Sequence, residues 1–184
     1  CDAVLGRHDS QALLESVEQA NLFLLPLDDE RRWWRYHHLF ADLLRSRLAR
    51  ENPARAVELH QAAADWYERH DLPDDALGHA LAGGDQEWAA RIVETQLERQ
   101  LWRRNEGATL ARWLNALPPD ALDARPRLVF GRAITSVLGG RLDDVEPLLA
   151  TVEAAPTTPP YRPSVERRAS VLSNLDAAVA LCRA

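Results

Sequence analysis

Apolar residues recur every three or four positions along most of this chain, the spacing that places them on one face of an α-helix. Gly and Pro residues separate these segments, for example at Gly83-Gly84 and Pro118-Pro119. We therefore expect short antiparallel helices of about 10–17 residues that pack side by side. The pattern predicts them over residues 10–20, 37–50, 56–70, 73–81, 110–117, 128–138 and 165–182, with two more starting at Asp85 and Asp143.

One stretch departs from the helical pattern. Residues 22–27 form a short apolar run, residues 28–30 are acidic, and residues 31–36 alternate charged and aromatic side chains. Two such runs around a polar turn predict an antiparallel β-hairpin. A helix opening on His37 and His38 follows, and we expect the hairpin to dock on it as a wing. The residues expected on the buried side of this helix are Leu39, Phe40, Leu43, Leu44 and Leu48.

The chain changes character at Asn52-Pro53, which divides it into residues 1–51 and residues 52–184. In the second part, small residues such as Ala63, Ala80 and Ala89 allow neighbouring helices to approach closely. A weak internal similarity relates the segments after Gly84 and Gly140, at an offset that a repeat length of about 34 residues does not explain. We expect a helical solenoid with degenerate, tetratricopeptide-like packing.

Composition and charge exclude several classes of protein. The net charge of −6 argues against a general nucleic-acid binder. No apolar run approaches the roughly 20 residues of a membrane span, and two cysteines, Cys1 and Cys182, are too few for a disulfide framework. A cytoplasmic protein without membrane contact is the simplest expectation.

All 22 basic residues are arginine. The absence of lysine excludes a P-loop lysine, a Schiff-base lysine and a Ser-Lys dyad within this sequence. Arginine-only usage, together with abundant Ala, Leu and Pro, is typical of a high-GC bacterial genome. Because the sequence also contains no Met, we expect it to be an internal fragment.

No arrangement of residues indicates catalysis or metal binding. The sequence contains neither a GxSxG elbow nor an HExxH motif. The acidic pairs, such as Asp74-Asp75, fall at expected turns and helix starts, where carboxylates are favoured for structural reasons. His60, His70 and His79 lack metal-ligand spacing on one helical face. We therefore expect no catalytic residue, no metal and no enzyme activity in this chain.

Two groups of aromatic residues are candidates for binding. The basic, aromatic run at residues 31–36 is compatible with DNA contact. The neighbouring acidic turn and the alternation, which is expected to place Trp and Arg side chains largely on different faces, instead favour aromatics that pack on their own helices. Among the other tryptophans, Trp66 and Trp113 fit the inward stripes. Trp88 and Trp102 lie off these stripes and are the candidates for a groove that binds a sugar or a peptide.

The run CDAVLGRHDSQALLESVEQANLFLLPLDDERRWWRYHHLFADLLRSRL at the start of the chain resembles a known family. It is similar to the end of the nucleotide-binding module of MalT-like, LuxR-type transcription activators, which are signal-transduction ATPases with numerous domains. The runs AVELHQAAADWYERHDLPDDALGHALAGGDQEWAARIVE and RPRLVFGRAITSVLGGRLDDVEPLLATVE resemble their helical-repeat sensor region. The resemblance is specific over about the first 95 residues and looser beyond.

The resemblance implies an all-α fold: a winged-helix remnant with one β-hairpin (residues 1–51), followed by a tetratricopeptide-like helical-repeat solenoid (residues 52–184). It places the P-loop and the DNA-reading helix-turn-helix outside this chain. His37, with His38 beside it, occupies the place of a histidine that contacts the β-phosphate of ADP in related switch ATPases. ATP and ADP would be cofactors of the intact protein, with none held by this fragment alone.

The implied function is regulatory. The fragment would couple nucleotide state and inducer binding to self-association of an ATP-dependent bacterial regulator, without touching DNA itself. Its partners would be its own upstream ATPase domain and a small-molecule or protein inducer. The alternative is a stand-alone helical scaffold for protein–protein interaction. A reading frame that encodes a Walker motif upstream and a helix-turn-helix downstream separates the first function from the second.

Overall fold

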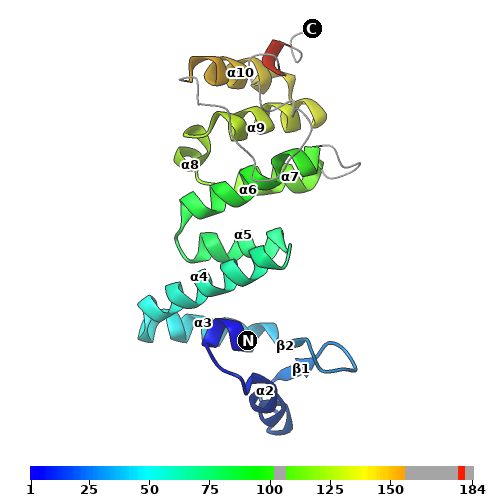
Figure 1. The fold of residues 1–184 in the computed structure, drawn as a ribbon, viewed down its shortest axis with the longest axis vertical. Helices are drawn as coiled ribbons and strands as arrows, with labels where there is room; N and C mark the ends of the chain where they lie inside the picture. The colour runs from blue at the N-terminus through cyan, green and yellow to red at the C-terminus, as the bar shows by residue number, and fades with distance from the viewer. Residues whose placement is uncertain (102–106, 156–177, 181–184) are drawn as a thin grey trace.

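Stacked helices make up most of the chain in this computed structural model, which describes residues 1–101, 107–155 and 178–180 (Figure 1). The hairpin and α2 lie at one end of the stack and α10 lies at the other. The elements, in order, are α1 (Asp2–Leu5), α2 (Ser10–Gln19), β1 (Leu24–Pro26), β2 (Trp34–Tyr36), α3 (His38–Glu51), α4 (Pro53–Arg69), α5 (Pro73–Ala82), α6 (Gln86–Leu101), α7 (Gly107–Ala116), α8 (Pro119–Asp123), α9 (Pro126–Leu138), the 3₁₀ turn η1 (Leu142–Asp144) and α10 (Val145–Ala154).

The predicted all-α fold with one β-hairpin and a following array of helices is confirmed. The predicted division at residues 51 and 52 falls between α3 and α4, and as a domain boundary it stays a prediction. The α1 helix was not expected from the sequence. Its Asp2 carboxylate accepts the backbone N–H of Ser10 at 3.0 Å, which satisfies a donor at the start of α2. Of the helix predicted over residues 165–182, only residues 178–180 are described, and they are helical.

The hairpin is shorter than its sequence predicted. The strands β1 and β2 pair antiparallel with Leu24 opposite Tyr36 and Leu25 opposite Arg35. Left-handed backbone at Phe23 (φ 59°) and Arg31 (φ 54°) interrupts the extended conformation outside these three-residue strands.

An Asp side chain closes the hairpin turn. The Asp28 carboxylate accepts the backbone N–H groups of Arg32 and Trp33 at 2.8 and 3.0 Å. Trp33, which precedes β2, is 53% exposed, and Arg35 is also exposed, whereas Trp34 and Tyr36 are half-buried. The expectation that Trp and Arg side chains lie largely on different faces stays a prediction.

Alanine residues form the contacts between α4, α5 and α6. Ala64, Ala76, Ala80 and Ala89 are fully buried, at 0% exposure. Ala63, Ala80 and Ala89, where the sequence predicted a close approach of neighbouring helices, are all buried. Bulkier side chains fill the core further along the array, where the largest fully buried residues of the described chain are Phe130, Leu97, Leu110, Leu114, Leu122, Leu128 and Leu149.

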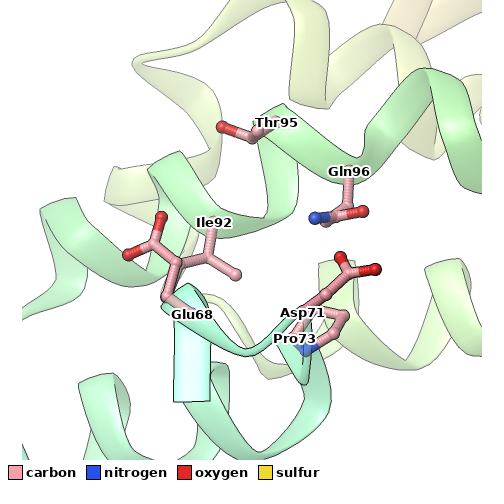
Figure 2. A pocket seen from close by; sticks show the side chains of 6 residues that line it. All are labelled: Glu68, Asp71, Pro73, Ile92, Thr95 and Gln96. Carbon is pink, nitrogen blue, oxygen red and sulfur yellow. The ribbon is translucent and has the colours of Figure 1, made fainter. Parts of the chain in front are cut away.

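The turn between α4 and α5 fits closely against α6 (Figure 2). The side chains that line this contact enclose a hollow of about 20 Å³, which is about the space of one water molecule. Asp71 in the turn has left-handed backbone (φ 56°), and its carboxylate accepts two hydrogen bonds from the Arg99 guanidinium at 2.7 and 3.0 Å. The turn is thus tied to α6 as well as packed on it.

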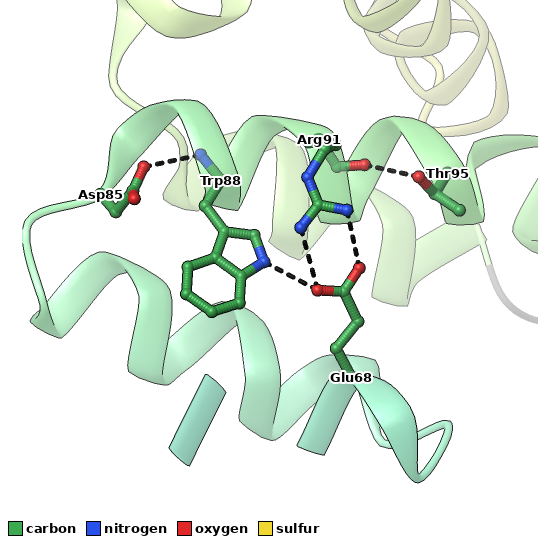
Figure 3. A network of polar contacts seen from close by, with 5 residues as sticks. All are labelled: Glu68, Asp85, Trp88, Arg91 and Thr95. Carbon is green, nitrogen blue, oxygen red and sulfur yellow. Dashed lines mark hydrogen bonds and ion pairs between the residues drawn. The ribbon is translucent and has the colours of Figure 1, made fainter. Parts of the chain in front are cut away.

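A second tie between α4 and α6 centres on Glu68 (Figure 3). The Trp88 indole N–H donates to the Glu68 carboxylate at 2.7 Å, and the Arg91 guanidinium donates to both of its oxygens at 2.9 and 3.0 Å. Asp85 caps α6 by accepting the Trp88 backbone N–H at 2.8 Å. We call the Glu68, Trp88 and Arg91 group the Glu68 clamp.

The same combination recurs one helix further along. The Asp74 carboxylate on α5 accepts the Arg112 guanidinium at 2.7 Å and the indole N–H of Trp113 on α7. Arg125, which precedes α9, forms ion pairs with Glu87 and Glu94 of α6. Carboxylates on α4, α5 and α6 therefore link these helices to segments beyond their immediate neighbours, and the ties help to set the angles between the helices.

The two helical glycines Gly78 and Gly131 allow a test of the packing between α6 and α9. A Cβ at Gly78 in α5 would meet nothing within 4 Å, whereas a Cβ at Gly131 in α9 would lie 2.5 Å from the buried Leu97 side chain. Gly78→Ala should raise the free energy of unfolding by about 0.5–1 kcal/mol. Gly131→Ala should gain nothing or lose about 1–3 kcal/mol by overpacking. Urea unfolding of both variants measures this, and equal gains would contradict the packing described here.

Glu68→Gln tests the Glu68 clamp. Burial raises the pKa of Glu68, but hydrogen bonds from Arg91 and Trp88 outweigh it and hold the pKa below its ordinary value. The stabilisation is therefore present above the unfolded pKa and is lost as the pH falls through the folded pKa. Because the Glu68 side chain is 32% exposed, we expect a loss of only about 1 kcal/mol at neutral pH, and convergence with the wild type in acid.

Urea unfolding at neutral and acidic pH measures this loss. Glu58→Gln is the matched control, because Glu58 pairs only with Arg55 on the same helix and its side chain is 62% exposed. It should change stability by less than about 0.5 kcal/mol. Equal losses in the two variants would show that the clamp adds nothing to an ordinary surface ion pair.

Candidate functional site at the wing and helix α3

His37 lies where the hairpin passes into α3. Its backbone N–H donates to the Phe23 carbonyl at 2.8 Å, and its own carbonyl accepts the N–H groups of Phe40 and Ala41 at 3.0 and 2.9 Å. The His37 backbone is therefore fixed by the wing on one side and by the first turn of α3 on the other. His38 begins the helix, and the two imidazole rings are exposed with their centroids 4.4 Å apart.

Aromatic packing holds this junction in place. Phe40 on the first turn of α3 lies between Phe23 and Tyr36, with ring centroids 5.3 and 5.6 Å away in tilted arrangements. Such aromatic pairs contribute about 0.5–1.5 kcal/mol beyond the area that they bury. The start of α3 is thus packed against Tyr36 of β2 and against Phe23, which precedes β1. The prediction that the aromatics of residues 31–36 pack on their own helices holds for Tyr36 but not for Trp33, which is 53% exposed.

The junction can donate hydrogen bonds to an anion. An imidazole carries at least one N–H in either protonation state, and the start of a helix carries a partial positive charge. His37 and His38 place two exposed rings at that start. Their contact with an ADP phosphate stays a prediction.

The helix α3 does not bury the apolar side that its sequence predicted. Leu39 is 67% exposed, Leu43 56% and Leu44 37%, while Phe40 and Leu48 are half-buried. Among the described elements, α3 packs chiefly against α4, so one neighbour covers only part of its apolar surface. The prediction was wrong because periodicity shows which side of a helix is apolar, but not what covers it.

The wing is exposed in the same way. Leu25, Leu27 and Trp33 are 54%, 52% and 53% exposed. Of the fourteen large apolar residues exposed in the described part of the chain, ten lie within residues 1–51. Apolar side chains gathered in one region, rather than scattered singly, mark an interaction surface. We call Leu25, Leu27, Trp33, Leu39 and Leu43 the exposed wing set.

The tryptophan candidates lie elsewhere. Trp88 is half-buried, packs against the core and donates its indole N–H within the Glu68 clamp. Trp102 lies outside the described residues. Trp113 is buried (2% exposed), and Trp66 is half-buried and stacks on His70 with ring centroids 3.9 Å apart. The sequence placed both of these on inward stripes.

Two hollows in the described chain do not offer a polar, ligand-sized site. The one beside Glu68 (Figure 2), about 20 Å³, is far below the roughly 300–1,000 Å³ of small-molecule pockets. A larger one of about 650 Å³ lies along α10, and its lining is mainly Ala and Pro, with Asp123 and Thr151 as the polar residues. It brings together no convergent set of polar groups.

The described ranges contain neither a metal-binding cluster nor a membrane-spanning helix. No three His, Cys, Asp or Glu residues there lie close enough together to hold a metal ion. No helix in the same ranges is long and apolar enough to span a bilayer. The acidic pairs have structural contacts where they were expected to, since Asp28 closes the hairpin turn and Asp74 binds Arg112 and Trp113.

One pair of residues was not predicted from the sequence. His60 and His79 lie 19 residues apart in the chain, but the structure brings their Nδ1 atoms to 2.9 Å. They lie on α4 and α5, two antiparallel helices joined by a short turn. Residues at similar distances from such a turn come opposite one another, and this is the signal that could have paired them.

Comparison with known proteins agrees with the geometry of the wing. Residues 1–56 match the family described as the MalT winged helix domain. The chain is 35% identical over 153 residues to the HTH-type transcriptional regulator MalT of Klebsiella pneumoniae (strain 342), and the match covers 82% of this chain.

That alignment spans only 16% of the Klebsiella protein. No solved structure matches the chain closely enough for comparison. The resemblance seen in the sequence is confirmed: the chain belongs to the MalT-like family of transcriptional regulators, and its first 56 residues match the MalT winged helix domain.

Proposed function

We propose that this chain is the joint between a nucleotide switch and a sensor in an ATP-dependent transcription activator. The observation that carries the proposal is the exposed wing set, because the wing and α3 present apolar side chains that the described chain leaves uncovered. In this proposal they dock on an ATPase domain that precedes them in the same polypeptide. The similarity to MalT supports the choice of a domain of the same protein over an unrelated partner.

In the closed state, His37 contacts the β-phosphate of ADP, with His38 as its neighbour. Two features support this role. The His37 backbone is held by both the wing and α3, which supports a fixed position of its Cα relative to the docking surface. Both rings are exposed at the start of a helix, where an anion is favoured. A ligand held in this way would bind the closed state better than the open one.

The helical array that follows is the sensor in this proposal. A small-molecule or protein inducer binds it, and binding changes the packing of the wing against the array. The helix α4 is placed to transmit this change, because it contacts α1 and α3 on the wing side and α5 on the array side. The change exposes surfaces for self-association of the intact protein. The chain itself binds and couples, and it catalyses no reaction.

Leu39→Ser tests the docking surface. In the isolated chain it should change the free energy of unfolding by less than about 0.5 kcal/mol, because Leu39 is already 67% exposed. In the intact protein it should lower the melting temperature and speed ADP release, because a buried leucine contact is lost. Leu142→Ser is the matched control, with the same 67% exposure at the far end of the array. Equal behaviour of the two variants in the intact protein would overturn the docking proposal.

His37→Ala tests the nucleotide contact. A hydrogen bond to a charged phosphate contributes about 1.5–3 kcal/mol, so ADP should dissociate at least about tenfold faster from the intact protein. Basal transcription activation should rise, because the closed state loses stability. His8→Ala, at an exposed position before α2, is the control. Unchanged ADP retention together with unchanged basal activity would exclude the proposed contact.

A further inference from the structure

His60 and His79 form a hydrogen-bonded pair between α4 and α5. Their Nδ1 atoms are 2.9 Å apart and their ring centroids 5.1 Å apart. Both side chains are half-buried. The Tyr67 ring stacks on the His79 ring, with centroids 5.4 Å apart and planes inclined by 20°. The helices are close here, since a Cβ at Gly83 would lie 3.3 Å from the His60 Cβ.

The pairing limits how many protons the two rings can carry. A hydrogen bond between two Nδ1 atoms needs one N–H donor and one lone pair. At most one of the two rings can therefore be an imidazolium while the bond persists. If both rings are protonated, both Nδ1 atoms carry a proton, the hydrogen bond is lost and two like charges face each other at short range.

The surroundings of His79 favour its neutral form. Burial lowers the pKa of His79. Electrostatic repulsion from His60 and from the guanidinium of Arg45 on α3 lowers it further. Asp75, one turn earlier on α5, acts in the opposite direction. Tyr67 stays neutral, because burial and then Asp75 raise the pKa of its phenol. The charged and titratable groups of α3, α4 and α5 around the ring thus leave His79 uncharged at neutral pH.

We propose that the His60–His79 pair is a pH-sensitive latch that fastens α4 to α5 at neutral pH and opens when both rings are protonated. The pair lies between the helix that contacts the wing and the helix that contacts the array, so its opening affects how these two parts are connected. The helix α4 contacts the wing elements α1 and α3, whereas α5 contacts α6 of the array. Opening therefore loosens the joint between the wing and the array. This inference does not depend on nucleotide or inducer binding.

The direction in which pH changes the free energy of unfolding follows from the protonation of His79 in the folded and the unfolded chain. Because the folded state holds the pKa of His79 below the ordinary value of 6.5, the unfolded chain takes up its proton first as the pH falls. Stability is thus complete above about pH 6.5 and decreases as the solution is acidified from there.

The test compares the 184-residue chain with its His79→Asn variant at about pH 7.5 and about pH 5.5. Asn offers a non-titrating amide near the position of Nδ1. The melting temperature of the wild type should fall on acidification by about 2–4 °C more than that of the variant. Hydrogen exchange, corrected for its intrinsic pH dependence, should show α5 and the facing part of α4 opening in acid in the wild type alone.

Two controls keep the test decisive. His8→Asn, at an exposed position outside the pair, should retain the full pH response of the wild type. His60→Asn removes the same latch from the other side and serves if His79→Asn does not fold. In the wild type, an NMR titration of the His79 ring should give a midpoint below 6.5. A midpoint at or above that value, or the same acid response in the wild type and the pair variants, would overturn the latch.

Discussion

Close approach of helices through alanine is the constraint on which the rest of this structure depends. Where α4, α5 and α6 meet, Ala64, Ala76, Ala80, Ala89 and Ala90 are all at 0% exposure. Side chains this small bring the helix backbones near one another. Longer polar side chains at the edges of the contact then reach across it, which is how the Glu68 clamp and the His60–His79 pair form. A larger residue at an alanine position would separate the partners of both.

Local and long-range features differed in how well the sequence predicted them. The helices, the hairpin and the inward position of Trp113 follow from periodicity and turn residues, which act within a few positions of the chain. The partners of Trp88 and His79 lie 20 and 19 residues earlier, and those contacts depend on the register between helices. Trp88 was expected off the inward stripes, but it is half-buried and packs against the core, and periodicity alone could not show that Glu68 would meet it.

The largest error concerned Leu39 and Leu43. Helical spacing places them on one apolar side of α3. The sequence pattern of such a helix is the same whether its own chain or another chain covers that side. In residues 1–51 only Ser10 and Leu24 are buried among the described residues. The wing therefore has almost no core of its own, and the burial that stabilises this chain lies in the array. Covering the wing surface is the way in which this end of the molecule can gain comparable stability.

The linear order of the helices has a mechanical consequence. Three successive contacts, α5 with α6, α6 with α9 and α9 with α10, separate the far end of the array from the α4–α5 contact, and each spans about 8–10 Å. The array is a lever about 30 Å long whose pivot is the α4–α5 contact. A tilt of about 5° at the pivot displaces α10 by roughly 2.6 Å, about half the rise of one helical turn. A change of a few degrees beside Ala80 thus becomes, at α10, a displacement large enough to make or break side-chain contacts.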